Sequence, residues 1–404
     1  MARKAKGNED KAASSPMDDF TNDLISAINK DSGSKVAYNL ERDVSPTHVK
    51  RWISTGSRQL DYIISNKNGG GLPEGRIVEI FGPPSIGKSH IALQIAKSTQ
   101  AMGGIVVYID TENATSVENL GLLGVDISRR FVYVDTHCTE EVLSIAESTI
   151  LKAKAMNKDV PVTIIWDSVA ASSPKAELLG DYDKDSIGLQ ARAISKGMRK
   201  ITGVIANQSV LLVCLNQTRT KIGVMHGDPT AVPGGSAIPY HASVRIKLGA
   251  GAQITDEKTG DVVGINVWAK TIKNKVAPPF RKCDFEIRFG VGIREHEQMF
   301  DMLREHGPET VDGKTIEVSG TGAYKNFSVI DSTTGQVLIE KKFYKKEFDK
   351  ILEDPKYKSY LDDLLEAAMV RKLNTKSGSE IDLESYEEVK AAAADLEDIV
   401  SDLE

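Results

Sequence analysis

The chain has 404 residues, of which 40% are hydrophobic and 27% charged, as in an ordinary globular protein with room for more than one domain. Its net charge of −6 is uneven, because residues 380–404 carry ten acidic residues and one lysine and leave +3 on the rest. No apolar run approaches the roughly 18 residues of a membrane helix, and no apolar segment of a signal peptide follows the basic start at residues 1–6. The three cysteines lie far apart, so neither disulfides nor a zinc site is expected, and a reducing cytoplasm fits.

The N-terminal region is expected to contain one short structural element. Residues 1–16 are polar and are predicted to be disordered. Within residues 17–50, helical spacing of apolar residues predicts a helix over 18–30, and residues 35–40 are predicted to form a brief strand. The apolar residues of the helix are Phe20, Leu24, Ile25 and Ile28. Because one helix and one strand have little of their own to pack on, we expect residues 17–50 to dock onto another subunit.

Residues 82–89 fit the phosphate-loop pattern of Gly, four residues, then Gly-Lys-Ser. A strand is predicted before the motif, over residues 76–81, and a helix after it, over residues 88–102. Glycines let backbone N–H groups turn inward on a phosphate, and the helix N-terminus adds its positive dipole end. Lys88 is expected to reach the β and γ phosphates, and Ser89 to hold Mg²⁺. The motif consists of Gly82, Pro83, Pro84, Ser85, Ile86, Gly87, Lys88 and Ser89.

Further strands and helices alternate after the motif. The predicted strands are 104–110, 131–135, 161–167 and 209–216, and the predicted helices are 139–156 and 187–206. These strands are continuous apolar runs, as expected for a parallel sheet covered by helices on both faces. The alternation predicts an α/β fold with nucleotide chemistry at the carboxyl ends of its strands.

The pattern changes in the last third of the chain. Residues 242–248, 262–272 and 285–289 are predicted to add antiparallel strands to the sheet. Short helices and a polar hairpin around 331–335 then predict a small α+β domain over residues 294–373. The acidic tail, residues 374–404, either competes with anions for a basic surface or only keeps the chain soluble, and its composition is compatible with both.

Two carboxylates follow predicted strands next to the phosphate loop. Asp167 ends the strand 162–167 and is expected to hold Mg²⁺, directly or through water. Glu112 lies just beyond the strand 104–110, where a base for the water that attacks the γ-phosphate is required. The alternative is that Glu112 caps a following helix and that Asp110 is the relevant acid.

Several segments together resemble the bacterial RecA recombinase family. They are Gly-Leu-Pro-Glu-Gly-Arg-Ile-Val-Glu-Ile at residues 71–80, Asp-Ser-Val-Ala-Ala at 167–171, Pro-Lys-Ala-Glu at 174–177, Asn-Gln at 216–217 and Lys-Ile-Gly-Val-Met at 221–225. The resemblance runs from residue 52 to 293 and implies a RecA-type phosphate-loop NTPase core over 51–293, with a mostly parallel central sheet and a polymerisation helix ahead of it. The C-terminal domain is similar only weakly, and its hairpin is more similar to RecA-type recombinases of tailed phages.

The resemblance also implies roles for individual residues. Glu112 would activate the attacking water, and Gln217 would sense the γ-phosphate. Lys273 and Lys275 would reach the γ-phosphate of a neighbouring subunit. Two DNA-binding loops would lie at residues 179–188 and 218–236. The implied DNA contacts are Arg192, Ser195 and Arg199 behind the first loop, and Arg219, Lys221, Gly234 and Gly235 in the second.

Four positions depart from the family's pattern, and the mildest is Ser89, which replaces the commoner threonine and keeps the hydroxyl. Asn119 stands where the family carries an aromatic residue on the adenine, which leaves Phe289 to stack on the other side. His226 replaces the usual phenylalanine at the tip of the second DNA loop, so base stacking there is expected to be weaker or pH-sensitive. Pro239 replaces a lysine at the subunit interface, while Tyr240 keeps an aromatic residue beside it.

The resemblance implies an ATP-dependent DNA strand-exchange recombinase that acts in homologous recombination and DNA repair. ATP and Mg²⁺ would be its cofactors. Its partners would be single-stranded and double-stranded DNA, further copies of the chain in a helical filament, a single-strand-binding protein and loader proteins. Two alternatives remain open: a hexameric helicase-like motor built on the same core, and an ATP-switched scaffold without strand exchange. Retention of Lys88, Glu112 and Asp167 argues against the scaffold.

Overall fold

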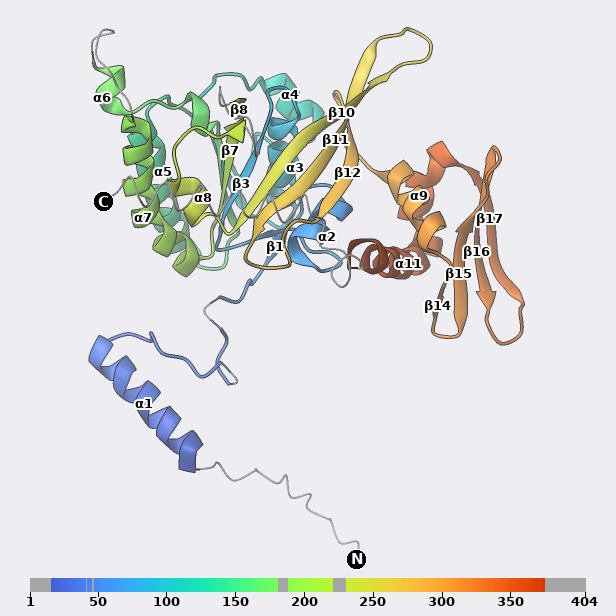
Figure 1. Ribbon diagram of the computed structural model, residues 1–404, viewed down its shortest axis with the longest axis horizontal. Coiled ribbons are helices and arrows are strands. Elements are labelled where there is room, and N and C mark those ends of the chain that lie inside the picture. The colour runs from blue at the N-terminus through green and yellow to red at the C-terminus, as the bar shows by residue number, and fades with distance from the viewer. Residues whose placement is uncertain (1–15, 41, 46, 181–187, 221–229, 375–404) are drawn as a thin grey trace, which may run out of the picture. The chain divides into compact units, whose positions relative to one another are not determined.

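The structure is a computed structural model that describes residues 16–40, 42–45, 47–180, 188–220 and 230–374 (Figure 1). The chain divides into two units, Met1–Val49 and Lys50–Glu404. The predicted disorder at the N-terminus and the acidic tail from residue 375 onward both lie outside the described residues, as do Lys221 and His226. Across the described part of the chain, no helix has the length and hydropathy needed to span a bilayer.

The first unit contains helix α1, Pro16–Ser32, which confirms the predicted helix. Phe20, Leu24 and Ile28 are exposed on it, so its apolar face is bare within this unit. The predicted strand over 35–40 is wrong, since those residues form no strand. A single strand has no neighbour to pair with here, and the Asn29 side chain instead binds this segment's backbone, accepting from the N–H groups of Val36 and Ala37 at 2.7 and 2.8 Å.

The second unit is built on one large sheet. Within the described residues it has nine strands in the order β13-β12-β11-β10-β3-β7-β6-β4-β5. The six strands from β10 to β5 pair in parallel, and those from β10 to β13 are antiparallel, which confirms the predicted mostly parallel α/β core with added strands. The bounds are β3 Ile77–Gly82, β4 Ile105–Asp110, β5 Phe131–Asp135, β6 Val162–Asp167, β7 Leu211–Gln217, β10 Val244–Thr255, β11 Val262–Asn274, β12 Lys282–Arg288 and β13 Gly292–Arg294.

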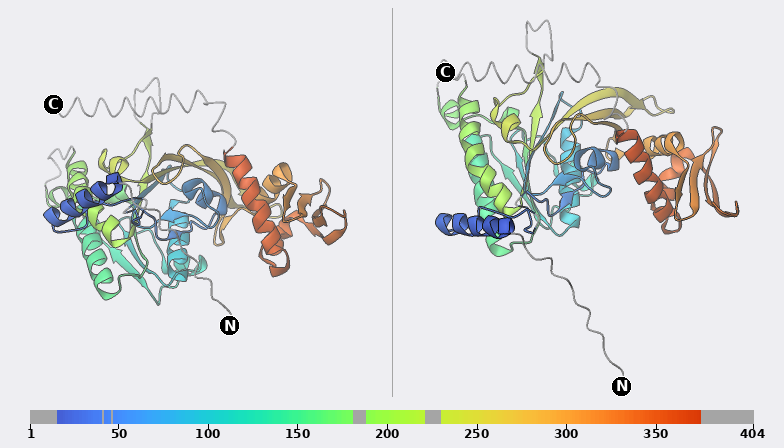
Figure 2. Two further views of the ribbon diagram at one scale, coloured as in Figure 1. Left: turned by 90° about the horizontal axis from the view of Figure 1, so that it is seen from below. Right: turned by 60° about the horizontal axis from the view of Figure 1, so that its bottom comes forward.

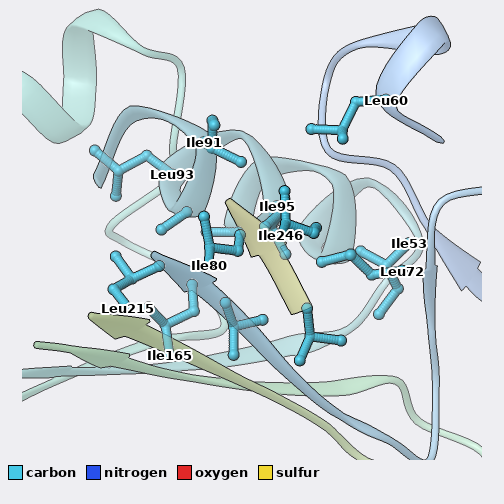
Figure 3. Packing of buried hydrophobic residues seen from close by; sticks show 14 of the residues in the cluster. Ile53, Leu60, Leu72, Ile80, Ile91, Leu93, Ile95, Ile165, Leu215 and Ile246 are labelled. Carbon is cyan, nitrogen blue, oxygen red and sulfur yellow. The ribbon is translucent and has the colours of Figure 1, made fainter. Parts of the chain in front are cut away.

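Helices cover both faces of this sheet. One face carries α2, Arg58–Ser65, α3, Lys88–Ala101, and α4, Val117–Leu122. Figure 3 shows Ile91 and Ile95 of α3 packed on residues of the sheet such as Ile80. The other face carries α5, Thr139–Met156, α7, Leu189–Gln208, and α8, Ala237–His241. Helices α5 and α7 run side by side there (Figures 1 and 2). Successive side chains of a strand point to opposite faces, so alternate residues of the buried strands pack into the hydrophobic cores on the two faces of the sheet.

Strand β5 corrects one expectation. Its apolar sequence predicted a strand covered on both faces, but it lies at the edge of the sheet. Val132 and Tyr133 are 48% and 44% exposed, whereas β3, β4, β6 and β7 are almost wholly buried. An apolar sequence shows that a strand has side chains to bury, but it does not show whether another part of the same chain covers them.

Helix α2 was not anticipated from the sequence. Ser57 caps its N-terminus by accepting a hydrogen bond from the Leu60 N–H at 3.1 Å, and the buried Glu295 carboxylate accepts from the Ser57 hydroxyl at 2.6 Å. Arg58 pairs with Asp362 at 2.8 Å. Helix α2 therefore connects the sheet domain to the residues that follow Glu295.

Residues 296–374 form a hydrophobic core of their own, to which Tyr62 of α2 also contributes. A four-stranded antiparallel sheet, β14-β15-β16-β17, packs there with helices, and the turn between β16 and β17 forms the predicted hairpin. The elements are α9 His296–His306, β14 Glu309–Val311, β15 Lys314–Ser319, β16 Tyr324–Asp331, β17 Val337–Tyr344, η2 Lys345–Glu347, α10 Phe348–Glu353 and α11 Pro355–Asn374. The remaining short elements of the chain are β1 Trp52–Ile53, β2 Leu72–Pro73, η1 Val169–Ala171, α6 Lys175–Leu178, β8 Arg219–Thr220 and β9 Thr230–Ala231.

Candidate active site

The sheet brings the phosphate loop and three other predicted site residues together at the carboxyl ends of its parallel strands. Strands β3, β7, β6 and β4 are neighbours and run in parallel, so their carboxyl ends meet. The phosphate loop follows β3, Gln217 ends β7, Asp167 ends β6, and Glu112 comes two residues after β4. Residues up to 135 positions apart in the sequence thus lie together at the carboxyl ends of the strands, where parallel sheets bind ligands.

The phosphate loop turns directly into helix α3. Gly87 caps the helix with φ of +92°, and a Cβ there would lie 2.2 Å from the Ile287 side chain of β12, so only glycine fits. Lys88 begins the helix, is 7% exposed, and donates to the carbonyl oxygens of Gly82 and Pro83 at 3.1 and 2.7 Å. Burial lowers the pKa of Lys88, although Asp167 and Glu112 oppose this effect. The ammonium group is therefore fixed inside the loop.

Asp167 lies beside the loop in a buried position. The Ser89 hydroxyl donates to Asp167 Oδ2 at 2.8 Å, and the Tyr108 hydroxyl donates to the same oxygen. Burial raises the pKa of Asp167, while the two hydroxyl donors act in the opposite direction. A hydroxyl and a carboxylate are oxygen ligands of the kind Mg²⁺ prefers, and this ion usually keeps several waters and binds phosphates as well. The pair therefore fits a nucleotide-bound Mg²⁺, although the described residues contain no cluster of three or more metal-binding side chains.

Glu112 is held from two sides. Its Oε1 accepts hydrogen bonds from Gln217 Nε2 at 2.8 Å and from the Ser168 hydroxyl. Asp110, the alternative acid, is instead occupied by local bonds: its oxygens accept from the backbone N–H of Glu112 at 2.9 Å and of Thr115 at 3.0 Å. Burial acts to raise the pKa of Asp110, but the bonds from Thr115 and its neighbours outweigh this effect and lower it. Of the two acids, Asp110 is buried and occupied by these bonds, whereas Glu112 is exposed at the strand ends.

Sequence reasoning missed two residues of this site. Tyr108 lies inside the apolar strand β4, where a tyrosine needs no functional explanation. Only the fold shows that its hydroxyl donates to Asp167. Ser168 follows Asp167 in the Asp-Ser-Val-Ala-Ala segment, so its position next to a predicted metal ligand was the available signal. Its backbone is fixed by Thr111, whose hydroxyl donates to the Ser168 carbonyl at 2.6 Å and accepts from the Ser168 N–H at 2.8 Å.

Lys273 and Lys275 are not brought to this edge. Lys273 is paired with Arg245 of β10, which is paired with Glu79 of β3, three residues before Gly82. At about 3.3 Å per residue and 4.8 Å per strand, the Lys273 backbone lies roughly 10 Å along the sheet and 10 Å across it from the phosphate loop of its own chain. Its ammonium donates to the carbonyl oxygens of Pro239 and Tyr240, both at 2.8 Å. Lys275 is exposed just beyond the end of β11.

Lys273 and Lys275 belong to a cluster of positive charges that also includes Arg199 and Arg245. Burial lowers the pKa of His241, and Lys273, Lys275 and Arg199 lower it further, so the charge of Arg199 acts at the same place. Burial and the neighbouring charges of Lys275 and Arg245 lower the pKa of Lys273 to about 8. The structure thus places Arg199 with the lysines, at a distance from the strand ends that carry Glu112 and Asp167.

The other predicted DNA and nucleotide contacts lie on separate elements. Arg192 is exposed and Ser195 half-buried in the first two turns of α7, and Arg219 is exposed in β8. Gly234 and Gly235 follow β9 with φ of +93° and +71°. Phe289 is 50% exposed and comes two residues after Ile287, whose side chain lies against Gly87 of the phosphate loop.

Comparison with known proteins adds an independent observation. The family model described as the RecA N-terminal domain matches residues 20–294. A "Protein RecA" of Ruminococcus albus is 42% identical over 255 residues, which cover 63% of this chain and 61% of that protein. One of Chlorobaculum parvum is 40% identical over 283 residues, which cover 70% of this chain and 78% of that protein. One of Nitratiruptor sp. is 40% identical over 304 residues, which cover 75% and 81%.

Proposed function

The chain belongs to the RecA family, and on that premise we propose that it is an ATP-dependent recombinase that coats single-stranded DNA and exchanges strands with a homologous duplex. The observation that carries the proposal is the hydrogen bond from Gln217 to Glu112. It joins Glu112, the proposed base for the attacking water, to the strand end that leads into residues 218–236, the proposed second DNA loop. A nucleotide at the loop and DNA on that segment would therefore act on the same pair of side chains.

The residues at the strand ends divide the chemistry of ATP hydrolysis among them. Lys88 and the N-terminus of α3 would bind the β and γ phosphates, and Ser89 with Asp167 would hold Mg²⁺. When bound, this ion neutralises charge on the phosphate oxygens. Glu112 accepts the proton of the attacking water, and its contacts with Gln217 and Ser168 hold the carboxylate in one orientation. The Asp167 contact with Tyr108 fixes the second carboxylate in the same way.

We further propose that the functional form is a head-to-tail filament. Lys273 and Lys275 lie too far from the loop of their own chain, which supports action on the nucleotide of a neighbouring copy. The apolar face of α1 is exposed, and β5 is an edge strand with exposed apolar side chains, so both offer surface to a second copy. A contact between unlike surfaces of successive copies repeats along a filament when its rotation does not close into a ring.

Assembly should fail when the apolar face of α1 becomes charged. Leu24→Asp with Ile28→Asp adds two carboxylates to side chains that are already exposed, so the subunit itself should fold normally. We expect a shift from large assemblies to single subunits in sedimentation with ATP and single-stranded DNA. The matched control is Ser26→Asp on the opposite face of the same helix, which should assemble like the unmodified chain. Equal assembly of the double variant would contradict docking through α1.

Hydrolysis should also depend on the charge of Lys273. Its pKa in the free protein is about 8, so the ammonium loses its proton as pH rises from 7 to 9. Because kcat/KM reports the groups of the free enzyme, DNA-stimulated kcat/KM should fall through a midpoint near pH 8. Lys273→Arg, which stays charged over this range, should remove the fall. An unchanged pH profile in the arginine variant would show that another group is responsible.

Strand exchange is the direct test of the proposed function. A circular single strand and a homologous linear duplex, incubated with the protein, ATP and Mg²⁺, should yield joint molecules and then a displaced strand. DNA-stimulated ATP hydrolysis with unwinding and no joint molecules would instead identify a motor. Nucleotide binding without either activity would identify an ATP-switched scaffold.

A further inference from the structure

Gln190, in the first turn of helix α7, has a connecting role that the proposed function does not use. Its side-chain Nε2 donates to the carbonyl oxygen of Val169 at 2.9 Å and to that of Ser172 at 2.6 Å. Because both partners are carbonyls and can only accept, the orientation of the amide is fixed by the contact itself. The two carbonyls lie at the start and just after the end of the single turn η1, so Gln190 clamps this turn to α7.

The clamped turn belongs to the same stretch of chain as the catalytic groups. Asp167 and Ser168 immediately precede η1, and the Ser168 hydroxyl donates to Glu112. Ser168 and Thr111 also exchange two hydrogen bonds that tie η1 to the end of β4. Any displacement of η1 would therefore move a hydrogen-bond donor of Glu112.

The first turns of α7 contact the exit of the proposed second DNA loop as well. A Cβ on Gly235 would lie 2.7 Å from that of Ala191, and one on Gly234 would lie 3.0 Å from the Ile194 side chain and 3.2 Å from that of Val169. Backbone and side chains are thus in close contact where η1, α7 and residues 234–235 meet. Such close packing transmits a displacement of one element to the next, because packed groups have low compressibility.

We propose that Gln190 is a positioning residue that couples DNA contact on helix α7 to hydrolysis at Glu112. It contacts η1 rather than Glu112, so it acts through the Ser168 donor. DNA bound at Arg192, two residues further along α7, would move or order this turn and, through the Gln190 clamp, change the orientation of the Glu112 carboxylate. The inference rests on the proposed DNA-dependent ATPase, and it adds a second connection beside the Gln217 contact.

The test compares two variants of one helix. Gln190→Met keeps the length of the side chain but cannot donate, and Gln208→Met makes the same change at the far end of α7. Val169 O keeps the Ser172 hydroxyl as a donor at 3.0 Å, so η1 should still form. We expect hydrolysis without DNA to stay within about twofold in both variants. The stimulation by single-stranded DNA should fall at least about fivefold in Gln190→Met only, the lower end of coupling between sites.

Gln190→Lys supplies the readout that a merely structural role would not move. Its ammonium can donate to both carbonyls, so it should restore most of the stimulation lost in Gln190→Met. Stimulation in Gln190→Met equal to that of the unmodified chain would overturn the inference. So would equal losses in Gln190→Met and Gln190→Lys, because donation would then be irrelevant. Absence of DNA stimulation in the unmodified chain would contradict the proposed function itself, a result that these variants cannot mimic.

A measurement on the unmodified chain covers the case in which Gln190→Met does not fold. Hydrogen exchange of the backbone amides at 169–172 and 189–193 should change together when single-stranded DNA is added in the presence of an ATP analogue. A change at 189–193 with none at 169–172 would show that the clamp transmits nothing, and would overturn the inference.

Discussion

Replacing Lys88 with alanine is expected to reduce ATP turnover at least about a hundredfold, since removal of one group that stabilises developing charge commonly costs this much. Lys88 is buried in the loop and is held by the carbonyl oxygens of Gly82 and Pro83, so its charge acts at a fixed point. In the described residues of the loop no other side chain carries a positive charge. The measurement is phosphate release with saturating single-stranded DNA.

The control for this prediction is Lys97→Ala. Lys97 lies on the same helix, α3, but is exposed two turns further on. The control should retain normal turnover, which separates loss of the phosphate charge from any effect on the helix. Near-normal turnover in Lys88→Ala would show that the loop is not the nucleotide site.

Glu112→Gln should lower turnover by roughly a hundredfold or more while ATP still binds, because the amide keeps the shape of the side chain but cannot act as a base. Its Oε1 can still accept from Gln217 and Ser168, so the arrangement at the strand ends should persist. The variant should also hold DNA longer in ATP, since hydrolysis no longer ends the bound state. Nucleotide affinity and DNA dissociation are measured beside turnover.

Asp110→Asn discriminates the two acids. Asp110 accepts hydrogen bonds from the backbone after β4. Asp110→Asn should therefore lower thermal stability together with turnover, whereas Glu112→Gln should lower turnover alone. If Asp110→Asn lost turnover with full stability and full ATP binding, while Glu112→Gln remained active, Asp110 would be the base.

The parts of the site that could be predicted from sequence are those encoded locally. The phosphate loop is a continuous motif between a strand and a helix, and the acids at Asp167 and Glu112 follow apolar strands, so parallel pairing alone brings them together. The roles of Gln217, Lys273 and Lys275 came only from the family resemblance. The fold then placed Gln217 on Glu112 and the two lysines elsewhere.

The parts that could not be predicted depend on partners distant in the sequence. Tyr108 and Gln190 are ordinary residues of a strand and a helix until the fold gives them Asp167 and η1 as partners. The apolar composition of β5 did not reveal that one of its sides is open. Likewise, residues 35–40 have strand-like composition but no strand beside them in their own unit. Both errors concern surfaces whose proposed partner is another copy of the chain.

We propose that this chain assembles on single-stranded DNA as an ATP-dependent filament. Electron microscopy with single-stranded DNA and a non-hydrolysable ATP analogue tests it most directly. We expect continuous helical filaments that cover the DNA and disappear when the analogue is replaced by buffer. Closed rings of a fixed subunit number, formed with or without DNA, would contradict it and favour the hexameric motor.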